Sequence, residues 1–132
     1  MEKKSFMGLF GLLVAALVSS SNMYAETVVN VVRAGTLSSV LKETEPQLKI
    51  TGSINGSDAK YLRSLVVDGK VTSLDLGEVR IVSGGTAYYE NYKTEADVLG
   101  ERMFFECSKL RYIVLPSTIT AIGNCAFSNS GL

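Results

Sequence analysis

Apolar residues near the end of the chain recur with a spacing that fits neither a regular helix nor a regular strand. In the stretch LRYIVLPSTITAIGNCAFSNSGL, residues 110–132, they alternate over Ile113 and Leu115 and continue beyond Pro116 at wider intervals. Alternation predicts a short strand, which ends at Pro116 because proline cannot donate a ladder hydrogen bond. The wider spacing that follows predicts a return path with several turns.

A similar pattern occurs further upstream. The stretch LGERMFFECSKL, residues 99–110, aligns with IGNCAFSNSGL, residues 122–132, at an offset of 23 that shortens to 22 at its end. The apolar spacing of residues 110–115 also occurs in VTSLDL, residues 71–76. Such a period lies in the range of leucine-rich repeats, whose stacked coils share one core and line up their strands in a parallel ladder. The expected repeat core comprises Leu110, Ile113, Leu115, Ile119, Ile122, Ala126 and Phe127.

Upstream of these repeats the pattern predicts helices that alternate with strands. A short helix is expected after Thr36, and a second helix over residues 58–67 with Ser57 as its N-cap. Alternating apolar residues predict strands over residues 47–51 and 71–76. This order predicts an α/β fold.

Residues 1–25 have the layout of a secretory signal peptide. Two lysines precede an uncharged apolar run over residues 6–18, and a small, polar stretch leads to Ala25. Cleavage is expected after Ala25, with Ser20 and Ser21 as alternatives. The run is short for a membrane span, which needs about 20 residues. We therefore expect a secreted or cell-surface protein with no membrane span after cleavage and no cysteine for lipid attachment.

Composition narrows the function classes. Of the 132 residues, 13 are Lys or Arg and 13 are Asp or Glu, so the formal net charge is zero and no basic patch indicates a nucleic-acid partner. The absence of His removes the commonest general base and zinc ligand. We therefore expect no enzymatic activity, no metal and no cofactor. A hydrolase with a carboxylate pair, or with Cys125 as nucleophile, is the remote alternative.

Residues 110–132 resemble one repeat of the BspA-like, treponemal-type leucine-rich repeats, with the pattern L-x-x-I-x-L-P-x-x-[VI]-T-x-I-G-x-x-A-F-x-x-C-x-x-L. Ser130 stands at the family's cysteine position, whereas Cys107 keeps it in the preceding half-repeat. The upstream sequence resembles the N-terminal cap of such proteins in gut and oral Bacteroidetes. The resemblance implies an N-terminal α+β cap, residues 26–96, followed by a short leucine-rich-repeat solenoid with a parallel strand ladder, residues 97–132, comprising roughly one and a half repeats.

The family implies an exported interaction module that binds host or bacterial proteins, as in adhesion, or a glycan. It supplies no catalytic residues. The alternative is a purely structural cap of a longer solenoid whose binding surface lies in further repeats. Because the last coil would expose an apolar edge, end-to-end self-association is also expected.

Two groups of side chains remain open to interpretation. Tyr88, Tyr89 and Tyr92 form a candidate binding loop, since tyrosine is enriched at interfaces, or they pack over the cap core and shield the first coil. Cys107 and Cys125 do not occupy equivalent repeat positions, so we expect two separate thiols, with Cys107 buried.

Overall fold

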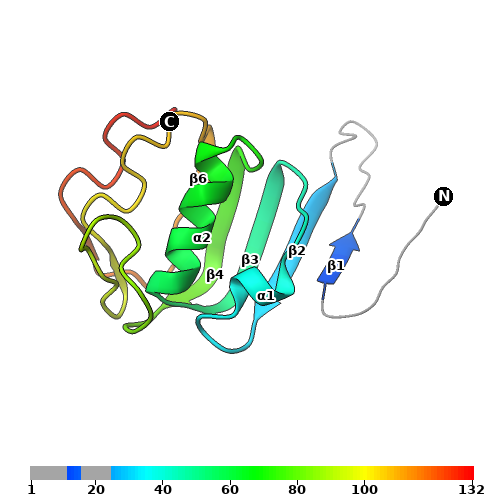
Figure 1. Ribbon diagram of the computed structural model, residues 1–132, viewed down its shortest axis with the longest axis horizontal. Helices are drawn as coiled ribbons and strands as arrows, with labels where there is room; N and C mark the ends of the chain where they lie inside the picture. Colours follow the sequence, from blue (N-terminus) through cyan, green and yellow to red (C-terminus); the bar gives the residue numbers. More distant parts are fainter. Residues whose placement is uncertain (1–11, 16–24) are drawn as a thin grey trace.

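The computed structural model describes residues 12–15 and 25–132 and shows an α/β fold built on a parallel sheet (Figure 1). Its strands are β1 (Leu12–Ala15), β2 (Glu26–Val31), β3 (Gln47–Ile54), β4 (Ser73–Ile81), β5 (Val98–Leu99), β6 (Tyr112–Val114) and β7 (Ala121–Ile122). Its helices are α1 (Leu37–Val40) and α2 (Gly56–Val67). The main sheet has the order β1-β2-β3-β4-β6, and β5 and β7 form a second, two-stranded sheet.

The strands of the main sheet follow one another in chain order. β2, β3, β4 and β6 are parallel, whereas β1 runs antiparallel to β2. The C-terminal turns lie at the side of the molecule away from β1 (Figure 1). Since β6 pairs with β4, the sequences expected to form the cap and the repeats share one continuous sheet.

Most of the expected signal peptide, residues 1–11 and 16–24, lies outside the described residues. The described part of it forms β1, in which Ala15 lies opposite Glu26. The expected cleavage site therefore stays a prediction. Among the residues that the structure describes, none of the helices is long and apolar enough to cross a membrane.

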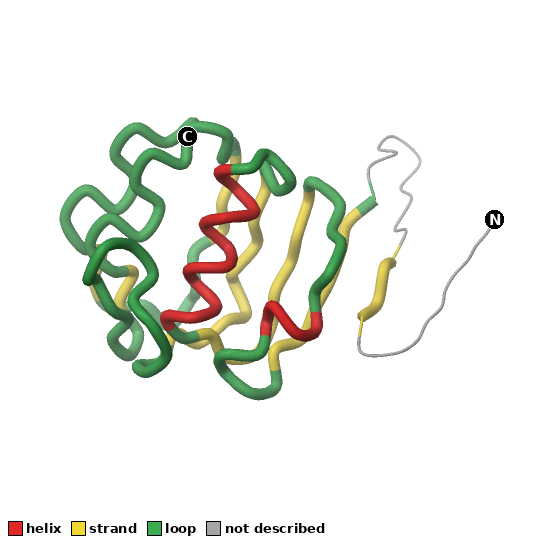
Figure 2. The backbone as a smooth tube through the Cα atoms, in the orientation of Figure 1, coloured by secondary structure: helices red, strands yellow, loops and turns green. Residues whose placement is uncertain are grey.

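The hydrophobic core lies between the main sheet and the two helices, which cover the same face of the sheet (Figure 2). In β2, β3 and β4 buried residues alternate with more accessible ones over most of each strand, as expected for a sheet that is packed on one face. In β3, for example, Leu48, Ile50 and Ile54 are buried, whereas Lys49 and Thr51 between them stay partly accessible. The remaining faces of the strands are thereby left for solvent or a ligand.

Helix α2 begins two residues earlier than predicted. Asn55, not Ser57, is its N-cap: the Asn55 side chain accepts from the Ser57 amide at 3.0 Å, and the Asp58 carboxylate accepts from the Asn55 amide at 3.0 Å. This capping box satisfies two amides that the helix itself cannot. The buried Asp58 carboxylate also accepts from the amides of Gly35 and Leu37, so it fastens the α1 region to α2.

The two predicted strands exist and are longer than expected, ending at Ile54 and Ile81. Strand β4 starts at Ser73, two residues later than predicted. Its register places Leu74 opposite Ile113, which agrees with the shared apolar spacing of the two stretches in the sequence. Strand β2 was not predicted.

Two turn segments with the same backbone conformation lie against each other. We call residues 98–108 the first turn segment and residues 121–131 the second. Three amides of the first donate to three carbonyls of the second: Arg102 to Asn124 at 3.0 Å, Phe104 to Ala126 at 2.8 Å and Glu106 to Ser128 at 2.8 Å. Left-handed backbone recurs at Arg102 and Cys125, with φ 56° and 57°, and at Glu106 and Asn129, with φ 60° and 58°. In the alignment of residues 99–110 with residues 122–132, Arg102 matches Cys125 and Glu106 matches Asn129.

The expected repeat core is only partly buried. Leu110 and Ala126 are buried. Four further members are half-buried: Ile113, Leu115, Ile119 and Phe127. Ile122 was expected in the core but is 55% exposed. The reason is that β7, among the described strands, has a neighbour on one side only.

Candidate functional site

The face of the main sheet opposite the two described helices presents polar and charged side chains in rows across the strands. We call it the open face. Its members alternate with the buried residues of β2, β3 and β4 and with the half-buried Ile113 of β6. They include Val28, Asn30, Lys49, Thr51, Asp75, Glu78, Arg80, Tyr112 and Val114.

A bulge in β4 decides which acidic residue reaches the centre of this face. Lys49 pairs with Asp75, but Thr51 pairs with Glu78, so β4 contains one extra residue there. The Gly77 amide donates to the Asp75 carboxylate at 2.9 Å and holds the bulge. Glu78 thereby comes within 2.8 Å of the Lys49 ammonium. The hydrogen bond from Lys49 to Glu78, together with the Glu78 charge, raises the pKa of Lys49 above the ordinary value.

Further polar pairs order the rest of the open face. The Thr51 hydroxyl donates to the Asn30 side chain at 2.9 Å. The Arg80 guanidinium donates two hydrogen bonds of 3.0 Å to the Asp97 carboxylate. At the β6 end, Tyr112 is 57% exposed. Paired charges of both signs and an exposed aromatic ring on the same surface are features of protein-binding surfaces.

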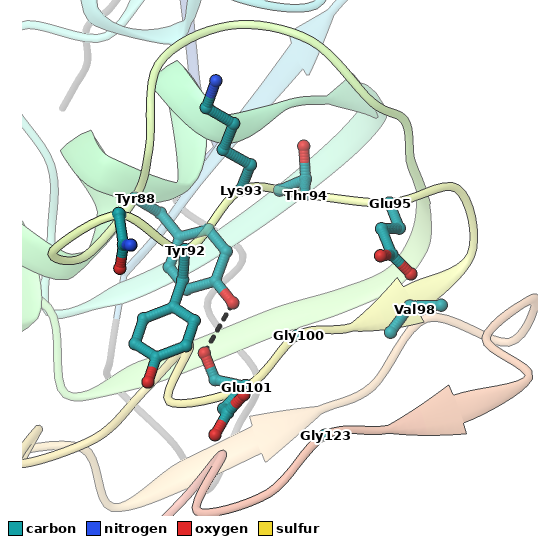
Figure 3. Close-up of a pocket in the computed structure, with 10 residues that line it drawn as sticks. Tyr88, Tyr92, Lys93, Thr94, Glu95, Val98, Gly100, Glu101 and Gly123 are labelled. Atoms are coloured by element: carbon teal, nitrogen blue, oxygen red, sulfur yellow. Dashed lines mark hydrogen bonds between the residues drawn. The ribbon is translucent and has the colours of Figure 1, made fainter.

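The candidate binding loop folds over the first turn segment and forms a pocket of about 440 Å³ (Figure 3). Tyr88 and Tyr92 line the pocket, whereas Tyr89 lies outside its lining. Its other lining residues are Asn91, Lys93, Thr94, Glu95, Val98, Gly100, Glu101 and Gly123. Tyr89 is half-buried and packs on Phe105 with 5.8 Å between ring centroids. The structure thus brings two of the three tyrosines to one pocket.

Tyr88 is buried, and its hydroxyl donates to the Glu101 carbonyl across the pocket floor (Figure 3). Burial, with the nearby charge of Glu101, raises the pKa of Tyr88 to about 12. A buried and hydrogen-bonded ring has little surface to offer a ligand. The contacts of Tyr88 therefore favour the packing interpretation for this residue.

Arg63 of α2 also binds carbonyls of the first turn segment, a role that was not predicted from the sequence. It is 8% exposed, and its guanidinium donates to the carbonyls of Met103 and Phe105 at 3.0 Å each. It also lies over the Tyr89 ring, 4.3 Å from the centroid. A sequence signal did exist, because Arg63 stands one helical turn after Ala59 and therefore lies on the buried side of α2.

Together, Tyr88 and Arg63 close one side of the turn segments. The carbonyls that they occupy belong to Glu101, Met103 and Phe105. The equivalent residues of the second turn segment are Asn124, Ala126 and Ser128, whose carbonyls accept amides of the first. Among the described residues no earlier turn segment supplies donors to these carbonyls, so the two side chains take that part, as a capping residue does at a helix end.

The two cysteines are separate thiols, as expected. Cys107 is buried, and burial raises the pKa of its thiol, an effect that the Arg63 charge partly offsets. Cys125 is exposed. Within residues 12–15 and 25–132, the structure brings no three acidic or cysteine side chains together in a way that would hold a metal ion.

Comparison with protein-family models and with curated proteins finds no match for the chain.

Proposed function

We propose that the chain is an exported interaction module of the leucine-rich-repeat type that binds a protein ligand on its open face. The observation that carries this proposal is the order of the main sheet. From β2 to β6, strands of the main sheet that follow one another in chain order pair in parallel, and both described helices cover the same face. Stacked coils with one strand each produce this order.

The turn segments support the repeat interpretation independently of the main sheet. Their strands β5 and β7 pair in parallel with Val98 opposite Ala121, and their backbone conformations recur at aligned positions. The interval between these positions equals the period of the sequence pattern that resembles BspA-like repeats. A solenoid of the leucine-rich-repeat type accounts for both the period and the stacking.

The open face suits a protein ligand better than a small molecule. It is a sheet surface, and its ion pairs lie in solvent: the side chain of Glu78 is 65% exposed and that of Arg80 is 59% exposed. Exposed charges of both signs contribute specificity and association rate in protein recognition. Tyr112 supplies the aromatic anchor that such interfaces commonly use.

Export is part of the proposal, and the signal-peptide pattern of residues 1–25 supports it. The BspA-like resemblance adds a location at the cell surface or outside the cell and an adhesive role toward host or bacterial proteins. If the chain is exported, the intact mass of the protein recovered outside the cytoplasm will correspond to a chain that begins after Ser20, Ser21 or Ala25. Recovery of the full-length mass would contradict it.

The binding experiment uses the exported protein against immobilised extracellular-matrix proteins of a host, bacterial surface proteins and glycans. For the protein ligand that binds, Tyr112→Ala and the double change Lys49→Ala with Glu78→Ala are each expected to weaken binding by about tenfold. Lys60→Ala is the matched control, because Lys60 is exposed on α2, which covers the opposite face. Binding to glycans alone, or loss of binding in the control only, would contradict the proposal.

The alternative, a purely structural cap of a longer solenoid, predicts a different result. In that case none of the immobilised proteins binds, and the open-face variants behave like the unchanged chain. The hydrogen bonds from Tyr88 and Arg63 to the first turn segment favour this alternative, because they close one side of the stack as a cap does. Binding that the open-face variants weaken supports the interaction module, whereas absence of binding to every immobilised protein supports the structural cap.

A further inference from the structure

The edge of β5 that faces away from β7 carries a backbone carbonyl and a backbone amide without partners. On the β7 side, the Leu99 carbonyl accepts from the Gly123 amide at 2.7 Å. Because hydrogen-bonding groups alternate along a strand in a parallel ladder, the Val98 carbonyl and the Gly100 amide face the opposite side. Neither of these two groups has a hydrogen-bond partner among the described residues.

Both groups belong to residues that line the pocket under the candidate binding loop. Gly100 is buried, and a buried amide is costly unless a ligand or solvent accepts its hydrogen bond. Of the lining residues, Gly123 alone belongs to the second turn segment, and the others lie between residues 88 and 101. A coil stacked beyond the second turn segment would therefore leave the pocket in place.

We propose that this pocket binds a short extended peptide segment with a basic side chain, whose backbone pairs with the free edge of β5. We call it the β5 pocket. One residue of such a segment would donate its amide to the Val98 carbonyl and accept from the Gly100 amide, which adds a strand to the edge. The β5 pocket is distinct from the open face, so the inference does not rest on the proposed ligand-binding function.

The charged side chains of the β5 pocket favour a basic ligand. Of the ten lining residues, Glu95 and Glu101 are acidic and Lys93 is basic. Figure 3 shows the Glu95 carboxylate directed toward Val98, whereas the Lys93 side chain extends away from the pocket floor. After burial, the charges of Glu101 and Glu95 both contribute to the raised pKa of Tyr88, so both carboxylates lie near the pocket. A lysine or arginine side chain complements these charges.

Other classes of ligand satisfy only part of this arrangement. An anion would face the two carboxylates and be repelled by them. A simple ammonium ion would pair with the carboxylates but would leave the Gly100 amide without an acceptor. The volume of about 440 Å³ suits a ligand of small-molecule size rather than a folded domain. The charges and the free backbone groups together therefore select a short basic peptide.

The test titrates the isotope-labelled full chain with acetyl-Ala-Lys-Ala-amide and follows the Gly100 amide by NMR. We expect a saturable downfield shift of its proton, and hydrogen exchange slowed by about fivefold or more at saturation. An analogue with N-methylated backbone amides keeps the charge but lacks the donors, so it should bind about two- to tenfold more weakly. Equal binding of the analogue, or no response of Gly100 to the peptide, would overturn the proposal.

Acidic variants test the charged part of the proposal. The double change Glu95→Gln with Glu101→Gln is expected to weaken binding of the lysine peptide by about threefold or more, and to leave binding of acetyl-Ala-Ala-Ala-amide unchanged. Glu106→Gln is the matched control, because Glu106 is exposed in the first turn segment and lies outside the pocket lining. The proposal fails if Glu106→Gln weakens binding equally, or if butylammonium shifts the Gly100 amide as strongly as the peptide does.

Discussion

The ring of Phe104 lies parallel to the ring of Phe127, with 5.9 Å between the centroids and 4° between the planes. The two residues hold the same position in the two turn segments, and the Phe104 amide donates to Ala126 at 2.8 Å. Side-chain stacking and backbone hydrogen bonding thus coincide at one point, which we expect to be a centre of stability for the C-terminal part.

Phe104→Ala is expected to lower the free energy of unfolding by about 3–5 kcal/mol, because Phe104 is 1% exposed and its removal leaves a cavity. Phe127→Ala should cost less, since its ring is half-buried. In urea unfolding, the double variant should show a coupling of about 0.5–1.5 kcal/mol between the rings. Strictly additive losses would mean that the rings do not interact.

Gly123→Ala tests how closely the turn segments approach. A Cβ atom at this position would lie 2.5 Å from the Glu101 amide nitrogen, so the segments would have to separate, at an expected cost of about 1–3 kcal/mol. Gly77→Ala is the comparison, since its Cβ would approach side-chain atoms of Asp75 and Val114 only to 3.2 Å. Thermal melts of both variants measure the difference. An equal loss would count against tight packing at Gly123.

Arg63→Met tests the capping role of the buried guanidinium. Methionine keeps much of the volume but donates no hydrogen bond, so the carbonyls of Met103 and Phe105 lose their donor. We expect a loss of about 2–3 kcal/mol in denaturant unfolding. Lys60→Met, on the exposed side of the same helix, should stay within about 0.5 kcal/mol of the unchanged chain. A neutral result for Arg63→Met would contradict the capping role.

Because of Tyr88, the free energy of unfolding is expected to fall at alkaline pH. Its pKa is raised from 10.0 to about 12, so the folded state keeps a proton that the unfolded state loses. The corresponding stability is fully present below pH 10 and is lost as the pH rises toward 12.

The Tyr88 prediction is checked by unfolding at a series of pH values. Tyr88→Phe should lower stability at neutral pH by about 1 kcal/mol, through loss of the hydrogen bond to Glu101, and should flatten the decline above pH 10. A decline of the same steepness in Tyr88→Phe would assign the alkaline effect to other groups.

Local periodicity predicted the elements whose apolar residues alternate or recur regularly. Helix α2 and strands β3 and β4 belong to this class. Strand β2 escaped prediction because the stretch TVVNVV is almost continuously apolar and shows no alternation, although its buried and accessible residues do alternate. The N-cap of α2 was misplaced because Asn55 and Ser57 are both good capping residues, and Asp58, three residues after Asn55, decides between them.

The candidate site depended more on long-range contacts. The bulge that turns Glu78 toward Lys49 arises from pairing between β3 and β4, which a local pattern cannot show. Similarly, Arg63 reaches carbonyls that lie far along the chain, at Met103 and Phe105. The sequence period did indicate the stacking of the turn segments, because equivalent positions carry related side chains, such as Phe104 and Phe127.

Side-chain footprinting by hydroxyl radicals, with and without the bound protein ligand, tests the central claim most directly. We predict that Tyr112 and Val114 of the open face become protected, while Tyr61 on α2 and Tyr92 at the pocket keep their reactivity. Protection of Tyr61 or Tyr92 with unchanged labelling of Tyr112 would contradict the assignment of the open face as the binding surface.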